Sequence, residues 1–294
     1  MRKNNLFLIF FMVLLLFTGC VRHNASLTNE NVSPEERKEI NLALAKAKES
    51  VQQGEENYEK KRDDAYKLWN EALLFRKSKI IESIPSGTEA AKDHLLEGTE
   101  PEVQAYYDKV RAREKQITVF MIDLAESCGG ILYGLPWSVK TGKSVMNKLD
   151  REKKINPDLR DIEIIHSFGD ILRYTILVED HDDLLAVARK VLASMKKKKM
   201  RVLTLSNKYI EPEKLYKDIK LYVQDRQGFK FEVQLHSWAS SSMYEKTHVI
   251  YEMERDVNTK PAVAKALKDY KGSLWQTLPA PKNIGELKSF DTMN

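Results

Sequence analysis

Cysteine is scarce in this 294-residue chain, and neither sign of charge is in large excess. The chain contains two cysteines, and 48 lysines and arginines stand against 43 acidic residues, which gives a formal net charge of +5. A charge this small does not argue for a nucleic-acid partner, so we expect no binding to DNA. The length leaves room for one sizeable domain and an additional helical segment, and 42% hydrophobic with 31% charged residues is an ordinary globular balance.

Charge is absent from a stretch near the N-terminus, where an apolar run from Leu6 to Phe17 follows a short basic head. This layout is typical of a secretory signal. The residues Phe17-Thr18-Gly19-Cys20 resemble the bacterial lipobox, which implies that residues 1–19 are removed and that Cys20 is lipidated. An uncleaved N-terminal anchor is the alternative. Acyl chains contribute about 0.8 kcal/mol per buried CH2, so we expect a lipoprotein on the exported side of the cell envelope, held to the membrane by Cys20.

Loss of residues 1–19 lowers the net charge to +3, because Arg2 and Lys3 are removed. If Cys20 is lipidated, Cys128 is the only remaining thiol, so we expect no intramolecular disulfide and no cysteine metal site. Residues 20–33 are polar, which predicts a flexible tether.

Residues 34–130 carry helical patterns. The run Ser33-Pro34-Glu35-Glu36 predicts a capped helix start, and apolar residues from Ile40 to Phe75 recur at helical spacing. A break at Pro85-Ser86-Gly87 precedes a second helix, which starts with a similar capping pattern at Thr99-Glu100-Pro101-Glu102 and ends near Cys128 before two glycines. We interpret this region as a helical hairpin that acts as a stalk or packing element, with residues 34–128 available to a protein partner.

Residues 131–256 alternate helical and strand patterns, which predicts an α/β domain, and residues 257–294 read as a C-terminal helix and tail. The short polar loop that ends at Gly228 separates two strands, so we expect an antiparallel hairpin and a mixed sheet. The expected helices are Lys143–Lys154, Asp183–Lys198 and Ala239–Glu254. The expected strands are Ile171–Val178, Arg201–Leu205, Ile219–Val223 and Phe229–Leu235.

Three polar motifs have ordinary interpretations. The run from Lys140 to Ser144 lacks the first glycine of a phosphate loop, because Trp137 stands there. Lys140, Lys143 and Lys148, with Ser144 at a helix start, still favour an anion, although a solvated basic helix start is the alternative.

The pair His181-Asp182 precedes a helix, so we expect Asp182 or Asp183 to cap it rather than to bind a metal. The run Lys196–Lys199 reads as a solvated helix end, with contact to an anionic membrane as a secondary role.

Two carboxylates form the strongest candidate site. Asp170 directly precedes one expected strand, and Glu232 lies in the middle of another. Carboxylates on neighbouring strands are suited to hold Mg2+ on the phosphates of a nucleotide. Alternation along the last strand places Glu232, Gln234 and His236 on one face. The alternative is an ordinary half-exposed strand.

From residue 134 to 255 the sequence resembles the RelA/SpoT alarmone synthetase domain. The resemblance is carried, in the family's order, by a basic segment, an aspartate-led strand with its following helix, a tyrosine-containing strand, a glutamate-containing strand and the helix after it. These segments are Lys140–Leu149, Asp170–Val178, Asp183–Leu192, Tyr216–Lys220, Phe231–Ser237 and Met243–Glu252.

The resemblance implies a nucleotidyltransferase-like mixed sheet that transfers pyrophosphate from ATP to the 3′ hydroxyl of a guanine nucleotide. It implies Mg2+ on Asp170 and Glu232, with Glu232 also as the base. It implies donor-phosphate contacts from Lys140, Lys143 and Lys148, and stacking of Tyr216 on the acceptor base. Ser144, Arg173, Lys220, Gln234 and His236 complete the residues expected to bind substrate.

The sequence departs from the family at several of these positions. Thr175 stands where arginine is usual and Arg173 lies two residues early. Asp218, Lys220, His236 and Ser237 replace the usual serine, histidine, arginine and threonine. The acceptor therefore stays open between a guanine nucleotide, an adenine nucleotide and tRNA. A toxin-like enzyme and a non-catalytic nucleotide-binding or interaction lipoprotein are the two function classes.

Overall fold

A computed structural model describes residues 33–256 and 258–292. The expected signal, the lipidation of Cys20 and nearly all of the expected tether lie outside the described residues. Among the helices that are described, none combines the length and the apolar character needed to cross a membrane.

The described residues are organised around one six-stranded mixed sheet. The strands lie in the order β1-β2-β5-β4-β3-β6, in which β2 and β5 are parallel and the other neighbours are antiparallel. The predicted mixed sheet and the β4–β5 hairpin are therefore confirmed. The strand bounds are β1 Ile131–Tyr133, β2 Leu172–Val178, β3 Arg201–Asn207, β4 Ile219–Gln224, β5 Lys230–Ser237 and β6 Phe290–Asp291.

The helices of residues 33–128 confirm the predicted helical character of this region but divide it further. Ser33 forms the predicted capping box with Glu36. The two long helices that the sequence predicts are each interrupted, at Asn57 and at Arg113. The second start has no side-chain cap, because its N-cap residue is Glu100 and not Thr99, whose hydroxyl donates to the Leu96 carbonyl. The helices are α2 Pro34–Glu56, α3 Tyr58–Lys77, α4 Thr88–Lys92, α5 Pro101–Ala112 and α6 Glu114–Ser127.

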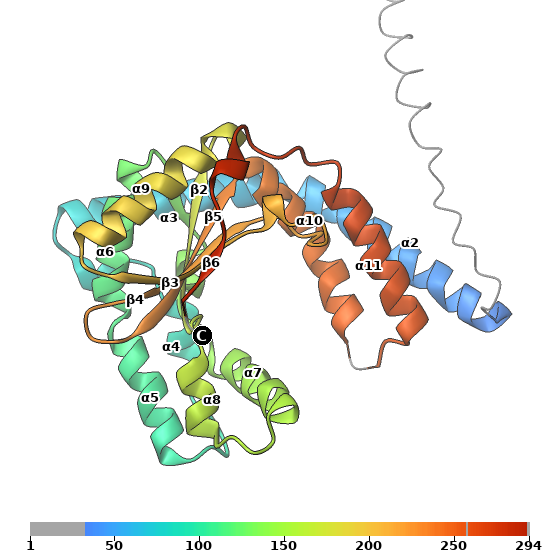
Figure 1. The fold of residues 1–294 in the computed structure, drawn as a ribbon, viewed down its shortest axis with the longest axis horizontal. Coiled ribbons are helices and arrows are strands. Elements are labelled where there is room, and N and C mark those ends of the chain that lie inside the picture. The colour runs from blue at the N-terminus through green and yellow to red at the C-terminus, as the bar shows by residue number, and fades with distance from the viewer. Residues whose placement is uncertain (1–32, 257, 293–294) are drawn as a thin grey trace, which may run out of the picture.

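The helices around the sheet cover one of its faces and extend from its two ends. Helices α6 and α9 pack on its apolar face, while α7 and α8 lie beyond one end of the strands and α10 leaves from the other (Figure 1). Their bounds are α7 Gly142–Ile155, α8 Asp161–Ser167, α9 Leu184–Lys197, α10 Trp238–Arg255 and α11 Pro261–Trp275. The apolar face carries the fully buried Tyr174, Phe231 and Val233, so this face holds the main core.

Helix α2 packs against α10 and α11 rather than pairing with the second predicted helix of its hairpin (Figure 1). Ala47, Ile250 and Leu267 form the buried centre of this three-helix group. Gly54 permits the close approach, because a Cβ atom there would lie 3.1 Å from the Lys246 Cα. Segments about 200 residues apart in the sequence thus form one small second core.

Candidate functional site

The second face of the sheet is polar, and the strand register defines its rows. Arg173 on β2 lies opposite Glu232 on β5, and Tyr222 on β4 lies on the other side of Glu232. In the next row Gln234 lies between Thr175 and Lys220. Paired residues of neighbouring strands project to the same face. The register therefore assembles a site from three strands.

Asp170 is held by two lysines at the start of β2. The Lys148 Nζ lies 2.7 Å from Oδ1 of Asp170, and the Lys140 Nζ lies 3.3 Å from Oδ2. Lys148 comes from α7, whereas Lys140 is fixed through its backbone, whose N–H donates to the Ile171 carbonyl and whose carbonyl accepts from the Tyr107 hydroxyl. Two elements thus converge on one carboxylate.

Asp170 and Lys140 each shift the pKa of the other. Burial alone raises the pKa of Asp170, but Lys140 and Lys148 outweigh it and hold the pKa of this carboxyl below its usual value. Burial lowers the pKa of Lys140, Asp170 opposes this effect, and the charges of Arg173 and Lys148 add to it. Asp170 is consequently ionised throughout the neutral range, beside an excess of positive charge.

Glu232 is buried, with 2% of its surface exposed, so the alternative of a half-exposed strand is wrong at this position. Its Oε1 accepts from the Gln234 amide at 2.6 Å, and its Oε2 lies 3.4 Å from the Lys220 Nζ. Tyr222 is the register partner of Glu232 on β4, and burial, Glu232 and Asp170 together raise its pKa.

Arg173 is the free cation of the site. Across the described residues its guanidinium has neither a hydrogen-bond nor an ion-pair partner, although its charge acts on Lys140, Lys220 and Tyr244. By register it lies opposite Glu232, three residues after Asp170. An unpartnered guanidinium in such a place is suited to bind a phosphate.

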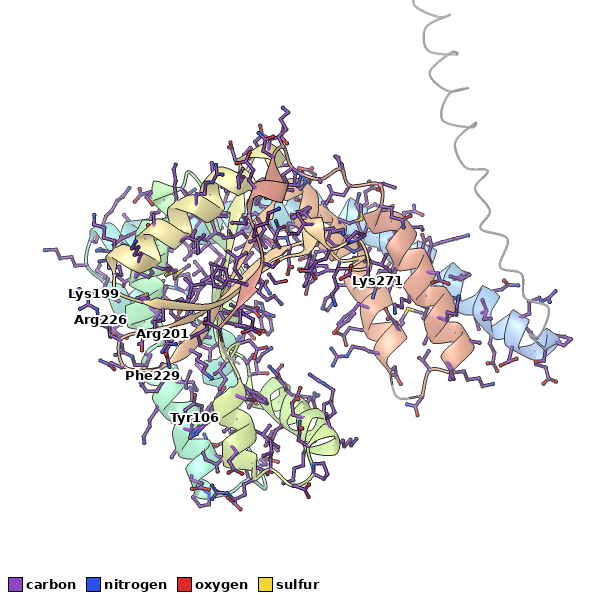
Figure 2. All side chains as sticks on the ribbon, in the orientation of Figure 1. Tyr106, Lys199, Arg201, Arg226, Phe229 and Lys271 are labelled. Atoms are coloured by element: carbon purple, nitrogen blue, oxygen red, sulfur yellow. The ribbon has the colours of Figure 1, made fainter. Side chains whose placement is uncertain are left out.

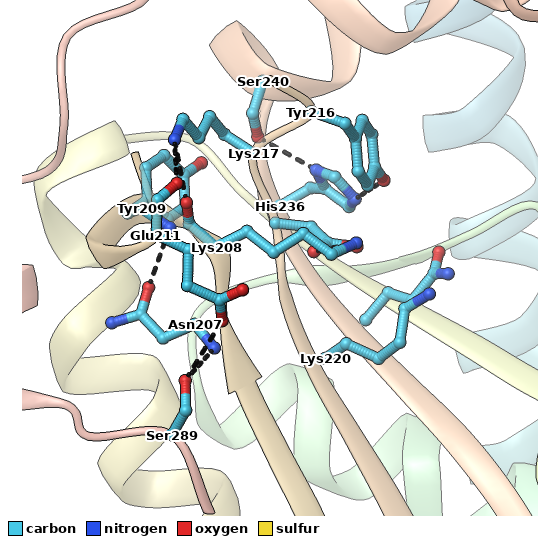
Figure 3. A network of polar contacts seen from close by, with 12 residues as sticks. Asn207, Lys208, Tyr209, Glu211, Tyr216, Lys217, Lys220, His236, Ser240 and Ser289 are labelled. Carbon is cyan, nitrogen blue, oxygen red and sulfur yellow. Dashed lines mark hydrogen bonds and ion pairs between the residues drawn. The ribbon is translucent and has the colours of Figure 1, made fainter. Parts of the chain in front are cut away.

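A second polar group continues the site along β5 (Figure 3). His236 is buried, and its Nε2 lies 3.1 Å from the Tyr216 hydroxyl while its Nδ1 lies 3.0 Å from the Ser240 hydroxyl. Burial lowers the pKa of His236 to about 4; the Asp218 charge opposes this shift, whereas nearby cations add to it. His236 is therefore neutral at pH 7.

Lys143 and Ser144 are not brought to Asp170, although the sequence predicts them beside Lys140 and Lys148. Both are exposed at the start of α7, where Ser144 interacts with the cap residue Thr141. The anion at this helix start is the chain's own Asp93, whose carboxylate accepts from the Lys143 N–H at 3.2 Å. A direct phosphate contact at this helix start would have to displace Asp93.

The other motifs have structural roles. Asp183 stands at the N-cap position of α9, as predicted, although its side chain makes no capping hydrogen bond. Asp180 caps the short 3-10 turn His181–Asp183 by accepting the N–H of Asp182, and the Asp182 carboxylate binds Lys282 of the C-terminal tail. The His181 ring bonds to the Ser237 hydroxyl at 2.6 Å and to the Pro279 carbonyl at 2.9 Å. The lysines of the run 196–199 lie exposed at the end of α9, as predicted, and Figure 2 places Lys199 at the edge of the molecule far from Lys271.

The donor set at the polar face fits a single Mg2+. Nowhere in residues 33–256 or 258–292 do three or more histidine, cysteine or carboxylate side chains converge on one point. Asp170 directly precedes β2 and Glu232 lies on the neighbouring parallel strand β5, and Mg2+ is commonly held by one or two carboxylates plus phosphate oxygens. Both acids are balanced by lysines in this structure, so an incoming metal and phosphate would exchange partners with Lys140, Lys148 and Lys220.

Comparisons with known proteins give remote structural similarity. No family model matches the chain, and no curated protein matches it. The chain is similar to small alarmone synthetase 1 from Bacillus subtilis bound to its product pppGpp, at 17% identity over 60% of this chain and 93% of that chain, with a TM-score of 0.44. A GTP pyrophosphokinase family protein from Streptococcus pneumoniae matches at 18% identity over 65% and 94%, with a TM-score of 0.43.

The type VI effector Tas1, in the complex with its immunity protein, matches at 19% identity over 59% of this chain and 94% of that chain, with a TM-score of 0.41. Identities and scores this low do not assign the activity of those proteins to this chain.

Proposed function

We propose that this chain is a Mg2+-dependent nucleotide pyrophosphokinase that transfers the pyrophosphoryl group of ATP to the 3′ hydroxyl of a guanine nucleotide. The observation that carries the proposal is the polar face, where Asp170 is held by two lysines and Glu232 lies buried with the unpartnered Arg173 in the opposite register position. Phosphoryl chemistry depends mainly on positioning and on charge stabilisation. A site of cations with two carboxylates supplies both.

In the proposed reaction the acceptor 3′ oxygen forms a bond to the β-phosphorus of ATP, and the bond from that phosphorus to the oxygen of the α-phosphate breaks, so AMP leaves. Glu232 takes the proton of the 3′ hydroxyl. Arg173, Lys140 and Lys148 bind the phosphates and balance the charge that moves to the leaving group. A Mg2+ ion on Asp170 and Glu232 would supply further charge stabilisation on the phosphate oxygens.

The acceptor is tested by offering several nucleotides. Purified full-length chain in detergent is incubated with γ-labelled ATP, Mg2+ and, separately, GDP, GTP, ADP or tRNA. We expect labelled product with a guanine nucleotide. If only an adenine nucleotide or only tRNA becomes labelled, the proposed reaction stands but that molecule, and not a guanine nucleotide, is the acceptor. ATP binding without any transfer would instead favour a non-catalytic nucleotide-binding lipoprotein, which the lysine-paired state of both carboxylates supports.

We also propose that the protein is an exported lipoprotein anchored through Cys20, on the basis of its N-terminal sequence. An exported enzyme that uses ATP fits a toxin-like role in which the domain reaches another cell, because ATP is scarce outside the cytoplasm. Metabolic labelling with palmitate tests the anchor. Label that is lost in Cys20→Ser supports it, whereas label that Cys20→Ser leaves unchanged rules it out.

A further inference from the structure

The ring of Tyr216 is already surrounded by side chains of this chain. Trp275 of α11 lies edge-on to it with ring centroids 5.0 Å apart, Tyr244 of α10 lies at 5.9 Å, and the Lys208 Nζ lies 4.5 Å from the ring centre. Its hydroxyl is engaged by His236 (Figure 3). A base that stacked on Tyr216 would have to displace one of these groups.

Trp275 is fixed in this position. Its side chain is 1% exposed, and its indole N–H donates to the hydroxyl of Thr247, which is also buried, at 3.1 Å. Displacing Trp275 would therefore break a buried hydrogen bond and open the contact between α10 and α11. Tyr216 is a poor stacking surface in this arrangement.

The aromatic group continues outward along α10. The rings of Tyr244 and His248 are 5.2 Å apart, and those of His248 and Tyr251 are 6.4 Å apart. Residues spaced by four and three lie on one face of a helix. Tyr251 is 43% exposed and the His248 side chain 44% exposed, so the outer part of this row is accessible.

This row begins at the polar face. The rings of Tyr244 and His236 lie 6.5 Å apart, which joins this row to the polar group on β5, and the charge of Arg173 opposes the rise that burial causes in the pKa of Tyr244. At the far end the Lys271 Nζ lies 4.9 Å and the Arg255 guanidinium 5.2 Å from the centre of the Tyr251 ring, and the Tyr251 hydroxyl accepts from Arg255, on the α10–α11 side of the molecule (Figure 2). Unlike the neighbours of Tyr216, these cations leave the residue 43% exposed. From Tyr244 to Tyr251 the helix rises about 10 Å, so a ribose near Tyr244 leaves room for its base farther along the row.

We propose that the base of the acceptor nucleotide stacks on His248 and Tyr251, outside Tyr216, while its ribose lies near Tyr244 and Arg173. The inference rests on the proposed function, because it assigns the acceptor side of that site. Aromatic rings bind nucleobases through their faces with little dependence on the base. His248 and Tyr251 are then positioning residues for the acceptor and take no part in donor binding.

Steady-state transfer with full-length protein tests this, with GTP varied at saturating ATP. For Tyr251→Ala we expect the KM for GTP to rise about tenfold, with kcat and the KM for ATP unchanged, and we expect Tyr251→Phe to restore it. Val249→Ala is the matched control, because Val249 is an exposed apolar residue of the same helix that lines a groove beside α2. This control should leave both KM values unchanged.

An unchanged KM for GTP in Tyr251→Ala, together with a lower KM in Trp275→Ala, would overturn the inference in favour of stacking on Tyr216. If the wild type transfers nothing to any acceptor, the proposed function fails first. Equilibrium dialysis with labelled GTP then decides the inference separately. Weaker binding to Tyr251→Ala than to Val249→Ala supports it, whereas equal binding, or no binding to the wild type, contradicts it.

Discussion

The Lys148 ammonium lies 2.7 Å from Asp170 and also 4.3 Å from the centre of the Phe168 ring, so α7 is joined to the start of β2 by one lysine. The side chains of Lys148 and Asp170 are 20% and 14% exposed, and water screens the pair only in part. The position of α7 therefore affects the charge around Asp170, because Lys148 belongs to this helix.

Replacing Lys148 should change both the titration of Asp170 and donor binding. In Lys148→Met we expect the pKa of Asp170 to rise toward its ordinary value, because one of the two cations that lower it is lost. We expect the KM for ATP to rise about tenfold or more, since hydrogen bonds to charged groups contribute about 1.5–3 kcal/mol. Carboxyl NMR titration and steady-state kinetics measure the two effects.

Lys154→Met is the control for that experiment, because Lys154 lies on the same helix and has no carboxylate partner among the described residues. Equal effects of the two substitutions would contradict the role of Lys148.

His236 should make the protein less stable in mild acid. Its pKa is lowered from an ordinary value of 6.5 to about 4 in the folded state, so the unfolded chain binds more protons between these pH values. Its contribution is fully present above pH 6.5 and is lost as the pH falls toward 4, by up to about 3 kcal/mol. Urea unfolding at several pH values measures this slope.

In His236→Gln the slope should become shallower. Part of it should remain, because burial also lowers the pKa of His181. Val249→Ala, which removes no titratable group from an exposed position, gives the comparison and should keep the wild-type slope. A slope that is identical in His236→Gln and wild type would contradict burial of a neutral His236.

Gly142 should tolerate no side chain at the start of α7. A Cβ atom there would lie 2.4 Å from the Leu95 carbonyl oxygen and 2.9 Å from an Asp93 carboxylate oxygen. We expect Gly142→Ala to lower the free energy of unfolding by about 1–3 kcal/mol and to weaken ATP binding, because α7 carries Lys148. Gly285→Ala, where a Cβ atom meets no neighbour within 4 Å, should change stability by less than about 0.5 kcal/mol.

The sequence was sufficient to predict the larger elements of the fold. The β-branched runs of β2, β4 and β5, and the polar loop ending at Gly228, predict the central hairpin and the mixed sheet. Strands β1 and β6 contain three and two residues and α8 contains seven. Elements this short show too few periods to be recognised, and they form because the rest of the fold packs against them.

The site was predictable only in part, because its contacts depend on register and on distant segments. Asp170 and Lys148 were recognisable from the order of motifs. Tyr222 belongs to the site because β4 pairs with β5 in one particular register, which no local pattern shows. Trp275 reaches Tyr216 from a helix 59 residues later in the chain. The sequence places Asp183 at the start of α9 correctly, but the 3-10 turn capped by Asp180 that precedes this helix lies within the usual one- or two-residue uncertainty of helix ends.

The proposed function depends most directly on Glu232, and Glu232→Gln tests it in the labelled transfer assay. Glutamine keeps the size of the side chain but accepts no proton, so we expect transfer to fall at least about 100-fold while ATP still binds. Glu126→Gln, which changes an exposed carboxylate of α6, should retain wild-type transfer. Transfer by Glu232→Gln at the wild-type rate would contradict the assignment of Glu232 as the base that receives the acceptor proton.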